Sequence, residues 1–276
     1  MATPIIKWAG GKRQLLPEIK KRMPKEYNRY YEPFFGGGAL FFDVEPHTAV
    51  INDANIQLIN VYRQIRRDYV HVCLHLLSFE HKYNGMPSEE DKVKYYNELR
   101  SDFNNYCIKE SELSPMSAAL FIFLNKSGYN GLYRVNRKGE FNVPSAKRKT
   151  IISYDLKNMK AVSSHLQHTH ILSGDFERAC ERATKGDFVF FDSPYYDTFD
   201  NYQANGFSED DHLRLANLFN TLTEKGVKCM LTNNDCDFIK DLYKGYYIDE
   251  VDVRRNINSD ASKRTGKEVI IRNYKE

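Results

Sequence analysis

The chain has 276 residues and a formal net charge of only +3, so binding to a polyanion would depend on local basic patches rather than on the overall field. Its five cysteines form no C-x-x-C pair, which argues against a disulfide framework and indicates reduced thiols, as in a cytoplasmic protein. The apolar run Ala118–Leu124 is much shorter than the roughly 20 residues that span a bilayer, so no membrane association is expected.

The first predicted element is a strand that leads through a glycine loop into a helix, over residues 30–42 (YYEPFFGGGALFF). Glycines let a ligand approach the backbone closely, and the start of a helix offers free N–H donors. A dinucleotide fingerprint would need a small residue three positions after its second glycine, where this chain has Phe41. Lys12 is followed by Arg13 rather than by Ser or Thr, so a phosphate-binding P-loop is not predicted either.

A short apolar strand, Ala49–Asp53, comes next, and a helix is predicted from Ile56 to Ile65. Asp53 lies where nucleotide-binding folds place the carboxylate that holds the ribose hydroxyls. Aspartate is also a good helix N-cap, so Asp53 could cap the following helix, and the two roles are compatible.

Between residues about 61 and 150 the pattern changes to helices rich in Tyr, His and Lys, followed by a stretch rich in Gly, Asn and Arg. We interpret residues 61–150 as an inserted domain. Segment 125–141 mixes basic, amide and aromatic side chains that can read or wedge bases, although its Asn-Gly pair is also typical of a solvent-exposed hairpin.

His71, Cys73 and His75 alternate in this insert, and His71 and His75 would share one face of a helix. No third or fourth ligand follows at a familiar spacing, so we predict no metal site.

Further strands are predicted at Thr169–Ser173, Phe188–Asp192, Val227–Thr232, Tyr246–Val253 and Glu268–Tyr274, with a helix at Asp210–Leu222. The alternation of strands and helices indicates an α/β fold with a largely parallel sheet. A polar loop without an obvious helix joins the last two strands, so these are expected to form an antiparallel edge.

The strand at residues 188–191 runs directly into the tetrapeptide Asp192-Ser193-Pro194-Tyr195. Ligands of α/β proteins bind at the carboxyl ends of the strands. Asp192 and the backbone carbonyl beside it can accept hydrogen bonds from an amino group, while Tyr195 can stack on a flat base. The pattern favours a site for a planar, amine-bearing ring; a simple strand-ending turn is the alternative, because Asp, Ser and Pro all favour turns.

Five segments resemble, in the same order, the Dam-type DNA adenine-N6 methyltransferases: residues 7–16, 32–38, 130–134, 141–144 and 174–176. The resemblance implies a Rossmann-like methyltransferase sheet with an antiparallel edge and an inserted helical target-recognition domain. Residues 1–60 and 151–276 would form the catalytic domain, and residues 61–150 the insert. The implied reaction transfers a methyl group from S-adenosylmethionine to N6 of adenine in double-stranded DNA, in GATC, with base flipping. The expected form is a cytoplasmic monomer, whose recognition site a cognate restriction endonuclease could share.

The resemblance also implies roles for individual residues. The catalytic residues would be Asp192, Ser193, Pro194 and Tyr195. The cofactor would contact Trp8, Lys12, Phe34, Gly36, Gly38, Asp53, Asp175, Phe176 and Asp192. DNA would contact Lys7, Tyr129, Asn130, Leu132, Arg134 and Pro144, with Tyr129 and Asn130 filling the gap beside the flipped base, Arg134 reading guanine, and Leu132 and Pro144 touching a thymine methyl group.

Two of these residues have a structural alternative. Asp175 could be an N-cap at the end of a strand, and Trp8, the only tryptophan, could anchor the core.

Adenine N6 is a poor nucleophile because its lone pair is delocalised into the ring. Hydrogen bonds to Asp192 and to the carbonyl of residue 193 would favour a tetrahedral nitrogen in line with the methyl group, without a metal. Residues 196–207 are expected to close over this base.

Family members usually carry proline where this chain has Ser193, and proline fixes φ and restricts the preceding residue. We therefore expect activity to be retained but slower. Two other functions stay open: methylation of RNA or of another amino group, and DNA binding without catalysis.

Overall fold

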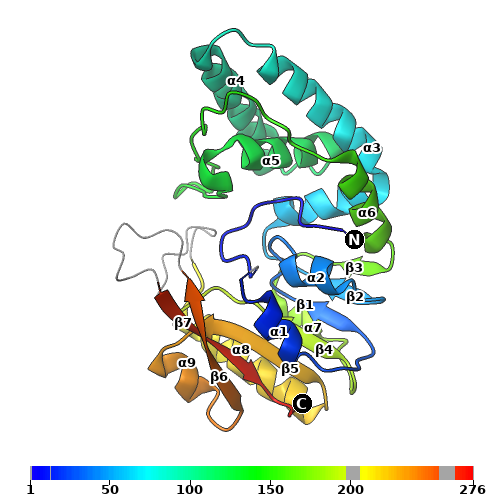
Figure 1. Ribbon diagram of the computed structural model, residues 1–276, viewed down its shortest axis with the longest axis vertical. Coiled ribbons are helices and arrows are strands. Elements are labelled where there is room, and N and C mark those ends of the chain that lie inside the picture. The colour runs from blue at the N-terminus through cyan, green and yellow to red at the C-terminus, as the bar shows by residue number, and fades with distance from the viewer. Residues whose placement is uncertain (1, 13, 197–205, 255–264, 276) are drawn as a thin grey trace.

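The computed structural model of the protein consists of a twisted sheet with helices on both faces and a group of helices standing above it (Figure 1). The structure describes residues 2–12, 14–196, 206–254 and 265–275. Helix α3 connects the two parts, and α6 brings the chain back to the sheet.

Seven strands form the sheet, in the order β3-β2-β1-β4-β5-β7-β6. The first five in this order are parallel, and β7 is antiparallel to both β5 and β6, which confirms the predicted α/β fold with its antiparallel edge. The strands are β1 (Tyr30–Glu32), β2 (Ala49–Ile51), β3 (Thr169–Ile171), β4 (Phe188–Phe191), β5 (Lys228–Asn234), β6 (Tyr247–Arg254) and β7 (Thr265–Arg272).

The predicted strand ends need small corrections. The third strand ends at Ile171 rather than at Ser173, while the fifth continues to Asn234. The last strand begins at Thr265 and ends at Arg272, because its pairing with β6 starts at Thr265, earlier than its apolar run suggests, whereas its pairing with β5 starts at Glu268.

The hydrophobic core lies on both faces of the sheet. Successive residues of β4 alternate between two apolar clusters: Phe188 and Phe190 enter one, Val189 and Phe191 the other, and all four are buried. The helices beside the sheet are α1 (Leu16–Arg22), α2 (Ala39–Val44), α6 (Leu156–Leu166), α7 (Phe176–Cys180), α8 (Glu209–Glu224) and α9 (Asp237–Leu242).

The upper helices are α3 (Ile56–Asn84), α4 (Glu89–Asp102), the π-helix η1 (Phe103–Lys109), α5 (Pro115–Ser127) and the 3₁₀ turn η2 (Tyr129–Gly131). Helix α3 is kinked at Asp68, whose φ of −160° is not helical. Helix α5 packs along α3 and is buried over most of its length, as its apolar sequence predicts. Its core residues belong to the same cluster as those of β2, so the upper helices and the sheet share one continuous core.

All five cysteines are free thiols. None of the helices in the described residues is both long enough and apolar enough to span a membrane.

Candidate active site at the carboxyl ends of the strands

The tetrapeptide at residues 192–195 follows β4, at the edge of the sheet where the parallel strands end. The neighbouring strand β5 holds it through side chains. Thr232 donates a hydrogen bond from Oγ1 to Oδ1 of Asp192 over 3.0 Å. Thr232 is fully buried, whereas the side chain of Asp192 keeps 20% of its surface exposed. The carboxylate is therefore held by a buried hydroxyl and is still accessible to a ligand.

Lys12 pairs with the same oxygen of Asp192. Its Nζ is 2.6 Å from Oδ1 of Asp192, donates to the carbonyl of Gly10 over 2.9 Å, and lies 4.4 Å from the centre of the Tyr195 ring. The Lys12 side chain is only 6% exposed. The Tyr195 hydroxyl donates to the carboxylate of Glu268 on β7, which fixes the plane of the ring. A cation therefore sits between a carboxylate and an aromatic face.

Three carboxyl groups lie near the ends of β1, β2 and β4, and each has a raised pKa. Burial raises the pKa of Asp192, while the Lys12 ammonium and the Thr232 hydroxyl act against this shift. Burial raises the pKa of Glu32 well above its ordinary value, and the Tyr30 hydroxyl donates to this side chain over 2.7 Å. Burial also raises the pKa of Asp53, to about 6.

Asp53 ties the glycine loop to the start of α3. Its Oδ2 accepts from the backbone N–H of Gly36, and its Oδ1 from that of Asn55, each over 2.9 Å. The N-cap of α3 is Asn55, which accepts from the N–H groups of Gln57 and Leu58. Asp53 therefore does not cap this helix, as one reading of the sequence had allowed; it fixes the loop at Gly36.

Gly38 immediately precedes α2 and has a left-handed φ of +67°. A side chain there would also meet the ring of Phe35, since a Cβ would come within 2.4 Å of it. Only glycine fits this position, for conformational and steric reasons together.

Aromatic rings line the neighbouring part of the edge. Phe34 stacks on Phe176 with ring centres 5.2 Å apart, and Phe207 meets Phe34 edge-on at 5.7 Å. Asp175 is the N-cap of α7, because its Oδ1 accepts from the N–H of Glu177, while its Oδ2 pairs with Arg214 over 2.7 Å. Asp175 is therefore a cap, as the structural alternative held, and keeps acceptors beside the Phe176 ring.

These groups fit a cationic adenosine derivative. The half-buried carboxyl groups of Asp53 and Asp192 make the edge attractive to positive charge, and burial has raised their pKa values, which a nearby cation would lower. The Phe34 and Phe176 rings provide apolar surface for a purine, and Asp53 and Asp175 provide acceptors for hydroxyl and amino groups.

Trp8 packs beside the glycine loop. Its ring lies 5.6 Å from that of Tyr133 in a stacked arrangement, and a Cβ on Gly36 would come within 2.6 Å of it. The side chain is only partly buried. Trp8 thus packs between the glycine loop and the segment at 129–144, as expected of a packing anchor.

The residues expected to contact DNA lie in segment 129–144 and, for Lys7, in the amino-terminal segment that hydrogen bonds to Asn125 of α5. The side-chain amide of Asn125 joins the backbone of Lys7 through two 2.9 Å hydrogen bonds, and it also donates to the carbonyl of Gly131. The N–H of Tyr129 donates to the carbonyl of Pro144 over 2.9 Å. The side chains of Lys7, Tyr129, Asn130, Arg134 and Pro144 are exposed, and Leu132 is half-buried.

Segment 134–142 forms a small hairpin, with an antiparallel bridge between Val135 and Phe141. The guanidinium of Arg134 is oriented by Asn142, since Nε donates to its Oδ1 over 2.8 Å. The turn that the Asn-Gly pair had suggested occurs earlier, at η2, where Asn130 and Gly131 both have positive φ.

Several residues of the site were not predicted. Asn233, Thr232 and Glu268 bind the tetrapeptide from neighbouring strands, and Arg214 contacts Asp175. The polar run at 232–234, at the end of an otherwise apolar strand, is a signal that could have identified two of them. Of the predicted closing loop, residues 197–205 lie outside the described part of the chain.

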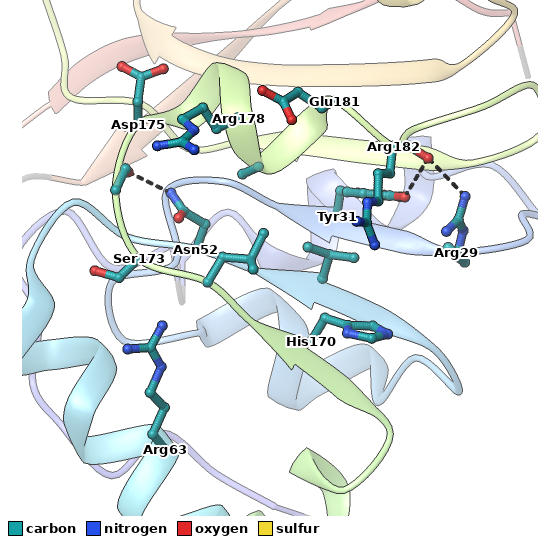
Figure 2. A pocket seen from close by; sticks show the side chains of 14 residues that line it. Arg29, Tyr31, Asn52, Arg63, His170, Ser173, Asp175, Arg178, Glu181 and Arg182 are labelled. Atoms are coloured by element: carbon teal, nitrogen blue, oxygen red, sulfur yellow. Dashed lines mark hydrogen bonds between the residues drawn. The ribbon is translucent and has the colours of Figure 1, made fainter.

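A cavity of about 480 Å³ lies over β1, β2 and β3 beside α7 (Figure 2). Arg178 and Arg182 line it, and the Asn52 amide crosses its wall to the carbonyl of Gly174. The carboxylate of Asp175 points away from it in Figure 2. No residue of the tetrapeptide lines this cavity, so it is separate from the open side of Asp192.

No cluster of three or more metal-ligating side chains occurs in the part of the chain that the structure describes. In α3, His71 lies 2.5 Å from the carboxylate of Asp68, and Cys73 is buried.

The sequence was compared with known proteins. The profile of the D12 class of N6 adenine-specific DNA methyltransferases matches residues 8–257. The type II methyltransferase M1.LlaDCHI of Lactococcus lactis subsp. cremoris is 41% identical, over 98% of this chain and 95% of its own length. The type II methyltransferase M.MjaIII of Methanocaldococcus jannaschii is 39% identical, over 98% and 99%. A DNA adenine methylase of Haemophilus influenzae is 30% identical, over 95% and 90%.

Proposed function

The chain belongs to the D12 class of N6 adenine-specific DNA methyltransferases, and on that premise we propose that it methylates the adenine of GATC in duplex DNA after flipping this base out of the helix. Enzymes of this family take the methyl group from S-adenosylmethionine.

The arrangement of Asp192, Tyr195 and Lys12 carries the proposal. The ammonium of Lys12 lies 2.6 Å from the carboxylate and 4.4 Å from the ring centre, which is where the amino group of a base stacked on Tyr195 would be placed. Lys12 thus marks a position that already suits a hydrogen-bond donor on a flat ring. Among the described residues no group donates to the carbonyl of Ser193, so this oxygen is available as the second acceptor.

When bound, S-adenosylmethionine supplies an electrophilic methyl group on a cationic sulfur. The protein contributes position and charge. Asp192 and the Ser193 carbonyl accept the two amino hydrogens of adenine, which turns the nitrogen lone pair out of the ring plane. The carboxyl group of Asp53 favours a cation at the sheet edge, and the Gly36 loop lets it approach the backbone. Extruding the base costs a few kcal/mol, which stacking on Tyr195 offsets.

Residues 61–150 would form the target-recognition domain, since the exposed side chains of Tyr129, Asn130 and Arg134 lie next to Lys7 of the catalytic part. Arg134 would read guanine, and the hydrogen bond by which Asn142 orients its guanidinium supports this role. Tyr129 and Asn130 would fill the gap that the flipped adenine leaves, while Leu132 and Pro144 would contact the thymine methyl group.

The relatives from Lactococcus lactis and Methanocaldococcus jannaschii are named type II methyltransferases. This supports a role in restriction–modification, in which an endonuclease cuts the same site when it is unmethylated. A DNA adenine methylase is also among the relatives, at lower identity.

A restriction-protection assay tests the proposal. Plasmid DNA incubated with the protein and S-adenosylmethionine should become resistant to a nuclease that cuts only unmethylated GATC, and a labelled methyl group should appear on adenine N6. Label in RNA rather than in duplex GATC, or label that persists in Asp192→Ala, would overturn it. Absence of any label would identify a DNA-binding relative without activity.

A further inference from the structure

Asn233 lies at the end of β5, beside the tetrapeptide, and is fully buried. Its side-chain oxygen accepts from two backbone N–H groups, that of Tyr196 over 3.1 Å and that of Asn234 over 2.9 Å. These two donors fix the orientation of the amide, because only the oxygen can accept. Its NH₂ group must then face the other way, toward Ser193 and Pro194.

On that side the amide nitrogen of Asn233 donates to Oγ of Ser193 over 3.3 Å and to the carbonyl of Pro194 over 3.4 Å. One buried side chain thus contacts the tetrapeptide at two successive residues and the chain just beyond it. The contacts follow in register along β5: Thr232 holds Asp192, Asn233 holds Ser193 and Pro194, and Asn234 donates to the carbonyl of Tyr196 over 3.0 Å.

Ser193 stands at a position where a proline ring would restrict the backbone directly. Serine does not restrict φ, but its hydroxyl offers an acceptor that proline lacks. The structure shows this acceptor in use by a buried amide that is itself fixed by two main-chain donors.

We infer that Asn233 is a positioning residue for methyl transfer, which holds the carbonyl of residue 193 in place through the Ser193 hydroxyl and so takes over part of the role of a proline ring. This inference rests on the proposed function, in which that carbonyl accepts a hydrogen bond from the target amine. Asn233 does not touch the reacting atoms; it acts through the backbone of residues 193 and 194.

The test is a double-mutant cycle that combines Asn233→Ala with Ser193→Pro, measured as kcat for methylation of a GATC duplex. Asn233→Ala should lower kcat by roughly 10- to 100-fold, since a shift of about an ångström in a reacting group costs on that order. The dissociation constants for the duplex and for S-adenosylhomocysteine should change by less than about threefold, because Asn233 contacts neither ligand. Ser193→Pro should raise kcat in both backgrounds, by a factor at least about threefold larger in Asn233→Ala than in the wild-type protein, because only the variant lacks the amide that holds residue 193.

Asn234→Ala is the matched control. Asn234 is the next residue on the same strand, and its side chain donates to the carbonyl of Tyr196, the residue just after the tetrapeptide, over 3.0 Å. Any loss that it causes should not be rescued by Ser193→Pro.

Two results would overturn the inference: a kcat for Asn233→Ala within about twofold of wild type, or an equal effect of Ser193→Pro in both backgrounds. If Asn233→Ala does not fold, Ser193→Ala replaces it, since this change removes only the hydroxyl; it should lower kcat where Ser193→Pro does not, and equal rates would overturn the inference. Asp192→Ala, assayed in parallel, distinguishes failure of this inference from failure of the proposed function. If Asp192→Ala still methylates DNA, the proposed function itself is wrong.

Discussion

The Lys12 ammonium and the Asp192 carboxylate form an ion pair of 2.6 Å, with the ammonium 4.4 Å from the centre of the Tyr195 ring. Burial raises the pKa of Asp192, whereas the charge and the hydrogen bond of Lys12 lower it. Asp192 accepts hydrogen bonds from an amine only on oxygens that carry no proton. The Lys12 ammonium therefore favours the ionised form of Asp192, which is the form that the proposed reaction needs.

Replacing Lys12 with Met should shift the pH dependence of activity. The substitution removes the cation that lowers the pKa of Asp192, while the burial that raises this pKa stays. Because the ionised form is active, the acid limb of kcat/KM should move to higher pH. A pH–rate profile of Lys12→Met beside Lys20→Met, a surface lysine paired with Asp43, measures this shift. An acid limb at the same pH in both variants and in wild type would contradict the role of Lys12.

The affinity for the cofactor should fall in mild acid because of Asp53. Burial raises the pKa of this carboxyl group to about 6. If its ionised oxygens hold the ribose hydroxyls, the dissociation constant of S-adenosylhomocysteine should rise by roughly tenfold for each unit of pH below that value. Calorimetry without DNA would measure the slope. Asp53→Asn should bind weakly at neutral pH and show no such slope; a variant that keeps the slope would assign it to another group.

Much of the fold could be predicted, because the spacing of apolar residues and the composition of a segment indicate a strand or a helix without knowledge of the rest of the chain. The apolar run at residues 188–191 and its polar continuation identified both β4 and the tetrapeptide. Strand ends were less certain, since β7 extends to Thr265 through pairing with β6 rather than through its own apolar residues. Pairing partners are a property of the sheet, and a single strand does not encode them.

The site was predicted in part for the same reason. Asp53 and Asp175 follow strands whose positions the pattern gives, but their partners do not follow from it. Arg214 reaches Asp175 from a helix far along the chain, and the Ser193 hydroxyl meets Asn233 only because β4 and β5 are adjacent. The contact between Lys12 and Asp192 likewise joins two ends of the sequence that only the tertiary structure brings together.

The Tyr195 ring should matter more than its hydroxyl. Stacking of a base on an aromatic side chain is worth about 1–3 kcal/mol, so Tyr195→Ala should lower kcat/KM by roughly 5- to 150-fold. Tyr195→Phe keeps the ring but loses the hydrogen bond to Glu268, and we expect it to stay closer to wild type. A duplex with 2-aminopurine at the target position gives a second measurement, because its fluorescence rises when the base leaves the stack. If both variants lose the same factor in kcat/KM, the hydroxyl of Tyr195 rather than its ring is needed for activity.

Arg134 should determine discrimination at a guanine of the site. Its guanidinium is exposed and is oriented by the side chain of Asn142 over 2.8 Å. A well-placed bidentate contact to guanine is worth about 1–3 kcal/mol of discrimination, so Arg134→Ala should lower kcat/KM on GATC by roughly 5- to 150-fold. Arg134→Ala should lower kcat/KM much less on a duplex in which another base replaces the guanine that Arg134 contacts.

Arg137→Ala is the matched control for Arg134, because Arg137 lies in the same hairpin and is also exposed. A residue that contacts only phosphate weakens binding to all sequences alike and reduces the salt dependence of affinity. The two variants should therefore change different quantities. Arg134→Ala should lower the ratio of kcat/KM on GATC to kcat/KM on the altered duplex. Arg137→Ala should leave this ratio unchanged. Steady-state rates on both duplexes at two salt concentrations separate these outcomes. If Arg134→Ala lowers both rates by the same factor, Arg134 contacts the backbone and another residue reads the base.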